Sequence, residues 1–355
     1  MTSRLARLRS RLAADGLDAL LVTNPVNRAY LSGFNGSAGV LLISQEAALL
    51  FTDFRYIERA TAQAPEFKVI RHENPMTKSI RAALEEHGIV KLGFEKDHVT
   101  YATFETYRDA FAPVELIATS GLVEELRQVK DQDEIDKLRR AAAIADAAYI
   151  HILKYLKPGV SERDVALELE YFMRKSGAEK LAFDIIPASG PRGSLPHAEA
   201  TGRILQDGDF ITLDFGCVYE GYCSDITRTV GIGGITDKQR EIYKIVLDAQ
   251  QAAVAACRAG ISGRELDAVA RDIIAGAGYG DNFGHSLGHG VGREVHELPR
   301  CSPTAEGALA ENMVVTIEPG IYIPNWGGVR IEDTVVVQPD GCERLTKSTK
   351  ELIVL

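Results

Sequence analysis

The stretch ITLDFGCVYEGYCSDITRT (211–229) decides the fold of the C-terminal part of the chain. It holds two apolar runs separated by a YEG turn signal, a pattern that predicts a β-hairpin. A turn at residues 219–220 would place Asp214 and Asp225 directly opposite each other. A turn at 220–221 would make them diagonal neighbours on the same face. Both registers therefore direct the two carboxylates to one side of the hairpin.

A second hairpin is predicted in IEPGIYIPNWGGVRIEDT (317–334), around the turn signal PNWGG (324–328). Glu318 and Glu332 flank this turn at an even separation, so a plain two-residue turn would send them to opposite faces. We infer a loop of odd length or a β-bulge, either of which returns both acids to one face. Pro319-Gly320 is the expected place for a bulge.

These four carboxylates and His289, in GHGVG (288–292), form a set of five potential metal ligands. Carboxylates in apolar strands are costly to bury as bare charges unless cations compensate them. One histidine with four carboxylates and no cysteine suits Mn, Co or Fe(II) better than a thiolate zinc site. Four negative charges exceed what one divalent ion neutralises, so we expect two ions. The alternative is that these acids are ordinary strand-end or surface carboxylates.

The composition indicates an acidic globular protein of two domains. The chain has 355 residues, 45% of them hydrophobic and 25% charged, with a net charge of -10 and a pI near 5.4. This balance argues against a nucleic-acid binder, which carries a basic face. Five cysteines without a CxxC pair indicate reduced thiols and a cytoplasmic protein. The basic N-terminus (1–16) lacks the apolar core of a signal peptide, and no apolar run approaches the roughly 20 residues that cross a bilayer.

Residues 1–125 alternate helix and strand signals, which predicts a small α/β domain with a mixed sheet. The segment SGFNGSAG (32–39) is interpreted as a turn-rich loop rather than a nucleotide-binding loop. The predicted helices lie near 3–14, 55–62, 77–86 and 101–111, and the predicted strands at 18–23, 39–44, 48–53, 67–70, 90–94 and 114–117.

Residues 126–355 are predicted to form an α+β domain with an internal pseudo-two-fold duplication. Long helices near 131–156 and 237–258 are each followed by a capping signal, Ser161 with Asp164 and Ser262 with Glu265. Each half then continues into strands and ends with one carboxylate hairpin. Two such halves facing each other would bring both acid pairs to one cleft.

The order Asp, Asp, His, Glu, Glu in DFG, SDITRT, GHGVG, IEPG and RIEDT resembles the pita-bread dinuclear metallopeptidases. The N-terminal α/β domain makes the chain most similar to their Xaa-Pro branch, which comprises Xaa-Pro dipeptidase (prolidase) and aminopeptidase P. The resemblance is strong over 183–334 and weaker over the first 125 residues.

The resemblance implies a role for each ligand. Asp214 would chelate one metal, His289 and Glu318 the other, and Asp225 and Glu332 would bridge both. The two divalent ions, Mn first and Co, Fe or Zn as alternatives, would generate the hydroxide that attacks the Xaa–Pro carbonyl. Glu318 would also carry the proton of the water.

The resemblance further implies catalytic roles for His197 and His296, as donors to the oxyanion or to the proline carbonyl. His285 is expected to pack beside the metals and contact substrate. HSLGH (285–289) is not the helical HExxH zinc motif, because its glutamate is absent and its glycines oppose a helix. Arg330, Tyr222 and Thr227 are expected to orient the ligand carboxylates.

Three residues bear on the substrate. Phe183 is expected to line the proline pocket; alternatively it is a strand-core residue. Arg300, in HELPR, would hold the free carboxylate of a dipeptide, unless it is a surface residue near the cleft. Arg55 is a second candidate for that carboxylate, although a surface ion pair with Asp53 is the stronger interpretation.

Hydrolysis of Xaa-Pro dipeptides is thus the first interpretation, and aminopeptidase P acting on longer peptides is the second. A metal-free creatinase-like amidinohydrolase and a non-catalytic binding protein on the same fold are remote alternatives, because neither keeps the full ligand set. Methionine aminopeptidase is disfavoured by the N-terminal domain. The resemblance also implies a homodimer, while the acidic composition and the lack of a long apolar run predict no nucleic-acid or membrane partner.

Overall fold

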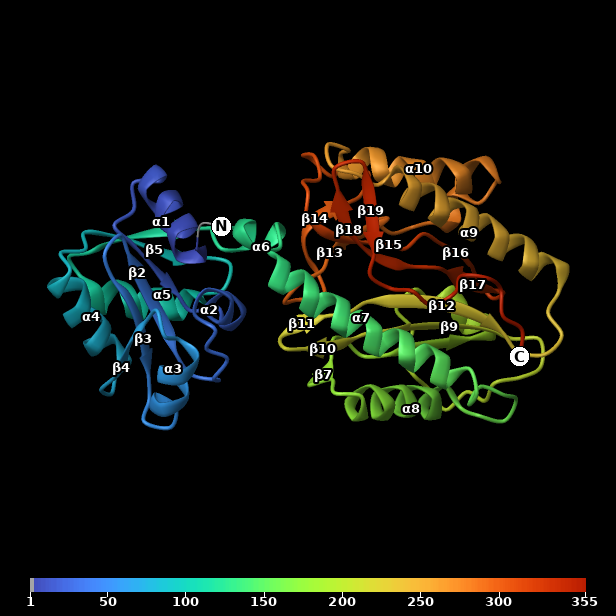
Figure 1. Ribbon diagram of the computed structural model, residues 1–355, viewed down its shortest axis with the longest axis horizontal. Helices are drawn as coiled ribbons and strands as arrows, with labels where there is room; N and C mark the ends of the chain where they lie inside the picture. Colours follow the sequence, from blue (N-terminus) through green and yellow to red (C-terminus); the bar gives the residue numbers. More distant parts are fainter. Residues whose placement is uncertain (1–2) are drawn as a thin grey trace. The chain divides into compact units, whose positions relative to one another are not determined.

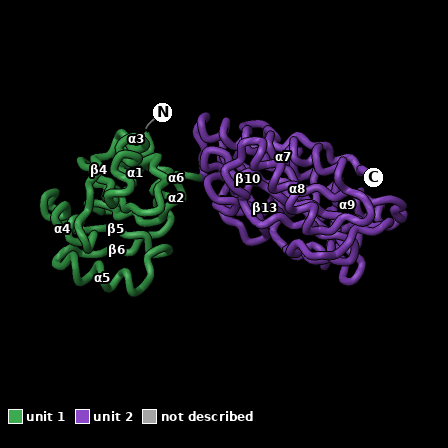
Figure 2. Tube along the Cα trace, turned by 90° about the horizontal axis from the view of Figure 1, so that it is seen from below, with its two compact units in different colours: residues 1–127 green, residues 128–355 purple. Residues whose placement is uncertain are grey.

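A computed structural model describes residues 3–355, and the chain divides at Arg127 into two compact units (Figure 2). Residues 1–2, which open the basic N-terminal segment, lie outside the described residues. Each unit has its own hydrophobic core, as expected for a chain of this length.

Unit 1 is an α/β domain built on one six-stranded mixed sheet, in the order β4-β3-β2-β1-β5-β6 (Figure 1). The β1–β2 and β2–β3 pairs are antiparallel and the other three pairs are parallel, so the predicted mixed sheet is confirmed. The strands are β1 Ala19–Val22, β2 Val40–Ser44, β3 Ala48–Thr52, β4 Lys68–Arg71, β5 Lys91–Glu95 and β6 Glu115–Thr119. The helices are α1 Arg4–Ala14, α2 Pro25–Ser32, α3 Ile57–Gln63, α4 Met76–Glu86, α5 Tyr101–Phe111 and α6 Glu124–Gln128.

Helices cover both faces of this sheet. Leu20 of β1 belongs to the cluster with α1, α2 and α3, whereas its neighbour Leu21 belongs to the cluster with α4 and α5. Strands buried on both faces become continuous apolar runs, which explains why their sequences show no alternation.

The short α6 was not predicted from the sequence, and neither was helix α2. Asn24 caps it by accepting a hydrogen bond from the backbone N–H of Val26 at 2.8 Å, and Pro25 occupies the first helical position. Asn-Pro was thus a helix-start signal here rather than a loop signal.

In unit 2 the order of two helices followed by strands occurs twice (Figure 1). The helices are α7 Gln132–Ile152, α8 Glu162–Lys175, α9 Asp237–Ala256 and α10 Gly263–Gly276. The predicted capping signals are confirmed: Ser161 exchanges hydrogen bonds with Asp164, and Ser262 does so with Glu265. Helices α7 and α8 share a core with the first hairpin, and α9 and α10 share one with the second.

The strands of unit 2 form small antiparallel sheets that carry the candidate ligands. Their orders are β11-β10-β7, β12-β9-β8, β14-β13-β15-β18-β19 and β16-β17. In the first half they are β7 Lys180–Leu181, β8 Ile186–Ser189, β9 Phe210–Phe215, β10 Cys217–Tyr219, β11 Tyr222–Cys223 and β12 Ile226–Gly231. In the second half they are β13 Gly288–Gly290, β14 Glu297–Cys301, β15 Val314–Ile317, β16 Gly320–Ile323, β17 Gly327–Arg330, β18 Asp333–Gln338 and β19 Gly341–Arg344. Short 3-10 helices lie at η1 Gly190–Ser194 and η2 Gly280–Asn282.

The first hairpin adopts the second of the two predicted registers. Tyr219 pairs with Tyr222, so Glu220 and Gly221 form the turn, with φ values of 46° and 76°. The same register continues into β9 and β12, where Asp214 pairs with Thr227. Asp225, two residues before Thr227, is therefore the diagonal neighbour of Asp214 on one face.

The second hairpin has a loop of odd length, which places Glu318 and Glu332 on the same face despite their even separation. Ile323 pairs with Gly327, which leaves a three-residue loop from Pro324 to Trp326. The register is the same before and after Pro319, because Ile317 pairs with Asp333 and Gly320 with Arg330. The bulge suggested at Pro319-Gly320 is therefore wrong, and the odd-length loop is right.

Two further expectations concern the chain as a whole. All five cysteines are free thiols, in line with the absence of a disulfide framework. Within residues 3–355, no helix combines the length and the apolar character that a membrane crossing requires.

Candidate metal centre

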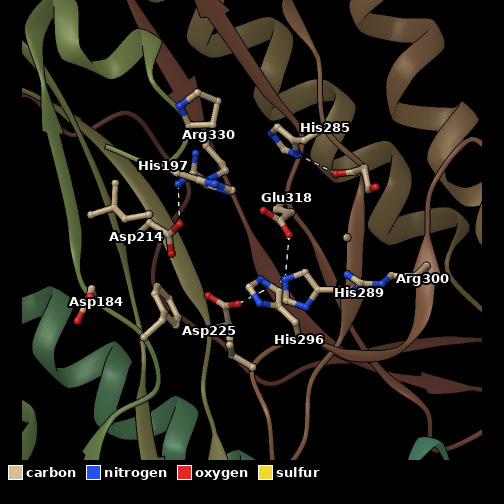
Figure 3. A pocket seen from close by; sticks show the side chains of 16 residues that line it. Asp184, His197, Asp214, Asp225, His285, His289, His296, Arg300, Glu318 and Arg330 are labelled. Carbon is tan, nitrogen blue, oxygen red and sulfur yellow. Dashed lines mark hydrogen bonds and ion pairs between the residues drawn. The ribbon is translucent and has the colours of Figure 1, made fainter. Parts of the chain in front are cut away.

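The five expected ligands converge in unit 2. Asp214 stands on β9, Asp225 directly before β12, His289 on β13, Glu318 after β15 and Glu332 between β17 and β18. Carboxylate oxygens of Asp214, Asp225 and Glu332 lie within 4.8 Å of one another. His289 Nε2 lies 3.2 Å from Glu318 Oε1 and 3.7 Å from Asp225 Oδ2 (Figure 3). Two hairpins that are far apart in the sequence thus deliver their acids to one point.

Burial makes these carboxylates costly as charges. Asp225 is 5% exposed and Glu332 only 1%. Burial and the neighbouring carboxylates raise the pKa of both groups well above its usual range. Burial also raises the pKa of Asp214, although Arg330 opposes the shift. Burial alone would raise the pKa of Glu318, but the hydrogen bond and charge of His289, together with the charges of His285 and Arg330, lower this pKa to about 2.

Two of the carboxylates are held by the protein through one oxygen only. Asp214 Oδ2 accepts a hydrogen bond from Arg330 Nη2 at 2.6 Å, and Glu332 Oε2 accepts one from Thr227 Oγ1 at 2.7 Å. In the described part of the chain, the other oxygens, Asp214 Oδ1 and Glu332 Oε1, are buried without a hydrogen-bond partner. Such orphaned acceptors are rare in native proteins. Divalent cations would satisfy both, so the residues fit the expected metals.

Arg330 and Thr227 support the carboxylates as the sequence analysis expected. Arg330 is 3% exposed and donates to Asp214, to Thr227 Oγ1 at 3.2 Å and to Tyr322 Oη at 2.7 Å. Tyr222 does not fit its expected role. Its hydroxyl donates to Glu134 on α7 at 2.9 Å, because β11 lies against that helix.

A cavity of about 330 Å³ opens over the acids. His197, His285 and His296 all line it, as does Arg300 from β14 (Figure 3). The rings of His289 and His296 approach edge to face, with centroids 4.3 Å apart. Burial and the nearby His289 lower the pKa of His296, so its imidazole is neutral near pH 7.

His285 is fixed in the cavity wall by Tyr322, which the sequence analysis did not single out. His285 Nε2 lies 2.8 Å from Tyr322 Oη, and the Tyr322 hydroxyl accepts a hydrogen bond from Arg330. The chain of contacts His285–Tyr322–Arg330–Asp214 links the cavity wall to a candidate ligand. The signal for Tyr322 was its place in β16, between the two glutamate motifs.

The three residues expected at the substrate have different surroundings. Phe183 lies between β7 and β8 and lines the cavity, so the strand-core alternative is wrong. Arg300 is exposed and lines the same cavity. Arg55 belongs to unit 1, where Nε and Nη2 donate to Asp53 at 2.9 and 2.8 Å. This is the surface ion pair that the sequence analysis considered the stronger interpretation of Arg55.

Comparisons with known proteins match the two units separately. Residues 136–339 match the metallopeptidase family M24, and residues 4–129 match the creatinase/prolidase N-terminal domain. A solved structure of an Xaa-Pro dipeptidase from Bacillus anthracis is 50% identical, with a TM-score of 0.98 over 99% of each chain. The Xaa-Pro dipeptidase of Pyrococcus furiosus is 40% identical over 99% of this chain and 100% of its own. A solved X-Pro aminopeptidase from Thermotoga maritima is also 40% identical, with a TM-score of 0.92 over 96% of this chain and 98% of its own.

Proposed function

The chain belongs to metallopeptidase family M24, and on that premise we propose that it hydrolyses the Xaa–Pro bond of dipeptides. The names of its relatives support this activity. The observation that carries the proposal is the buried acid cluster, in which Asp214 and Glu332 each keep one oxygen without a partner among residues 3–355. A creatinase-like or binding protein would have no use for such a cluster.

We propose Asp214, Asp225, His289, Glu318 and Glu332 as the ligands of two divalent metal ions, with Asp225 and Glu332 as the bridging pair. Their mutual distances and the hard oxygen donors support this assignment. Metal ions held by these residues would supply activation of a water molecule and polarisation of the scissile carbonyl. We propose Mn as the metal, which metal analysis of the purified protein would test.

The proton transfers fall to residues of the cavity wall. The Glu318 carboxylate, whose Oε1 lies 3.2 Å from His289 Nε2 at the floor of the cavity, would accept the proton of the attacking water. His296 is neutral near pH 7 and keeps one N–H. His197 and His296 would donate hydrogen bonds to the carbonyl oxygen as negative charge develops on it. His285, held by Tyr322, would bound the space for substrate.

Dipeptide preference depends on Arg300. Its guanidinium lines the cavity and could bind the carboxylate of the proline residue, while Phe183 packs on the pyrrolidine ring. Arg55 is the weaker candidate for this carboxylate, because its guanidinium is already bound to Asp53. A longer Xaa-Pro-Yaa peptide has no carboxylate at that position. Cleavage by aminopeptidase P chemistry is therefore the second candidate, favoured by the Thermotoga relative.

The deciding experiment compares Ala-Pro with Ala-Pro-Ala as substrates, with Mn added and with chelator. We expect faster cleavage of Ala-Pro and loss of both activities with chelator. Faster cleavage of Ala-Pro-Ala would establish the aminopeptidase alternative. Full activity in a sample without transition metal would remove the metallopeptidase mechanism.

We also propose that the protein is a cytoplasmic homodimer. The dimer rests on the family resemblance, and the location rests on the free thiols. Light scattering of the purified protein and fractionation of its source cells would test the two statements separately.

A further inference from the structure

A second cavity, of about 500 Å³, adjoins the one over the acids. One wall is a face of α8, with Arg163, Ala166, Leu167 and Glu170 at the spacing of a single helix face. The opposite wall consists of Leu181 and residues 184–186 and 197–200. Asp184, Ile186 and His197 line both cavities, so the second cavity begins where the first ends.

The orientation of a bound dipeptide makes this cavity relevant to specificity. This step rests on the proposed function. Figure 3 shows Arg300 and Asp184 on opposite sides of Asp225, Glu318 and His289. A dipeptide whose carboxylate binds Arg300 and whose scissile bond lies over the acids therefore directs its first residue towards His197 and Asp184. A long side chain of that residue would extend into the second cavity.

The lining of the second cavity matches a long aliphatic chain that ends in a positive charge. Leu167, Leu181, Ile185 and Ile186 supply apolar surface, and Leu167 is 59% exposed. The acids Asp184, Glu170 and Glu199 outnumber the one cation, Arg163.

Asp184 is the acid at the boundary of the two cavities, where the side chain of residue Xaa would enter. Glu199 is also exposed but lines the second cavity only. Glu170 is already bonded to Arg174 at 2.8 Å. Asp184 is exposed on the wall common to both cavities, and no ion pair to it forms among residues 3–355.

We propose that the second cavity is a subsite for the side chain of residue Xaa, and that Asp184 makes it select lysine and arginine. The aliphatic part of such a side chain would pack on Leu181 and Ile185. The ammonium or guanidinium group would pair with the Asp184 carboxylate. Lys-Pro and Arg-Pro are thus the preferred substrates among dipeptides of similar length.

The test compares Lys-Pro with norleucine-Pro, which has the same aliphatic chain without the ammonium group, and with Ala-Pro. The wild-type protein should have a higher kcat/KM for Lys-Pro than for norleucine-Pro. Asp184→Asn should lower that ratio by about two- to fivefold, the range of an exposed ion pair. Glu179→Gln, an exposed acid outside the cavity, is the matched control and should leave the ratio unchanged. Arg163→Gln should raise it.

A second variant tests the cavity apart from the charge. Leu167→Trp places a large ring in the opening at an exposed helix position, where folding is tolerant. It should lower kcat/KM for Lys-Pro and norleucine-Pro relative to Ala-Pro. Unchanged relative rates would overturn the placement of the side chain in this cavity.

The outcomes separate this inference from the proposed function. If the wild-type protein with Mn cleaves none of the three dipeptides, the proposed function fails. If it cleaves Ala-Pro but Asp184→Asn leaves the ratio of Lys-Pro to norleucine-Pro unchanged, the subsite assignment fails alone. An equal loss on all three dipeptides also overturns it, because Asp184 would then act on a group they share. Melting temperature and metal content, measured for each variant, exclude a change in folding.

Discussion

At the scale of single residues, the candidate metal centre is defined by two carboxylates in which only one oxygen accepts a hydrogen bond from the protein. Thr227 donates to one oxygen of Glu332, and Arg330 donates to one oxygen of Asp214. The second oxygen of each carboxylate has no hydrogen-bond partner within residues 3–355. A hydrogen bond of this kind fixes the orientation of the free oxygen and costs little, because the donor is itself buried and in need of a partner. The protein thus prepares the ligands before any cation binds.

Replacing a bridging acid should remove both metal and activity. Asp225→Asn and Glu332→Gln keep the shape of each side chain but remove its charge. We expect turnover of Ala-Pro to fall by at least about a hundredfold, since ligands matter more than the groups that support them. Elemental analysis should show less metal per chain. Near-native turnover in either variant would refute the bridging assignment.

The support from Thr227 can be tested without touching a ligand. Thr227→Val removes the donor to Glu332 Oε2 and keeps the β-branched shape. We expect metal affinity to fall about 10- to 100-fold, as for other groups that orient ligands. Thr212→Val is the matched control: the hydroxyl of this buried threonine bonds to Thr229 Oγ1 at 3.1 Å rather than to a carboxylate. An equal loss of metal affinity in both variants would show that the effect comes from a general loosening of the strands and not from the hydrogen bond to Glu332.

The role of Arg300 has a distinct kinetic signature. Arg300→Ala should raise KM for Ala-Pro more than for Ala-Pro-Ala, because only the dipeptide presents a carboxylate at that site. Steady-state kinetics on both substrates measures the difference, and the tripeptide serves as the internal control. Equal increases would show that Arg300 does not bind the carboxylate.

At the scale of elements, the hairpin turns set the register that brings the acids together. Glu220 and Gly221 form a two-residue turn with positive φ at both positions, and a glutamate at the first is unfavourable. Glu220 therefore costs local strain, while Gly221 supplies the second position without strain.

Relieving that strain should stabilise unit 2. Glu220→Asn places a residue that tolerates positive φ in the turn, and we expect a gain of about 0.5–1 kcal/mol. The lost ion pair with Lys137, at 4.0 Å and with Glu220 57% exposed, contributes little. Glu220→Ala loses the same charge but keeps the strain. Calorimetry should therefore show a higher melting temperature for the asparagine variant alone, and a gain in both would point to the charge.

The hairpins could be predicted from the sequence because side chains alternate between the two faces of a strand, which allows each hairpin only a few registers. This alternation alone could not choose between turns at 219–220 and 220–221, since both put the acids on one face. Nor could it separate the three-residue loop of the second hairpin from a bulge at Pro319. The choice depended on local backbone angles, such as the φ of 62° at Asn325, which the sequence only suggests.

At the scale of the whole molecule, tertiary partners were the least predictable part. Tyr322, 37 residues from His285 in the chain, links it to Arg330 through a contact that no local pattern announces. Tyr222 lies close to Asp225 in the sequence, but its hydroxyl bonds to Glu134 on α7, because β11 packs against that helix. The five ligands were predictable because metal chemistry constrains residue type, whereas supporting contacts can be made by many residue types.

A buried ionic network joins the C-terminal residues to the metal hairpins. Arg228 and Asp333 are fully buried and paired at 2.8 Å, and Lys350 Nζ lies 2.6 Å from the second oxygen of Asp333. Arg228 also donates to the backbone carbonyl of Glu332. Lys350, near the C-terminus, is thereby tied to Asp333, the residue that follows the candidate bridging ligand Glu332. Such a pair fixes the arrangement of the strands rather than adding net stability.

Metal removal should loosen both hairpins together and leave unit 1 unaffected. The candidate ligands come from both halves of unit 2, so bound cations would hold one half against the other, and without them the carboxylates repel. At free metal a hundredfold above Kd, binding contributes about 2.7 kcal/mol. For a domain of this size that corresponds to a melting temperature higher by about 5–10 °C.

Hydrogen exchange after chelation should speed up in residues 210–231 and 314–334, while β2 and β3 of unit 1 keep their protection. Asp225→Asn, already depleted of metal, should show a smaller change with chelator. Uniform loss of protection in both units would mean that the cations stabilise the chain in general rather than joining these two hairpins.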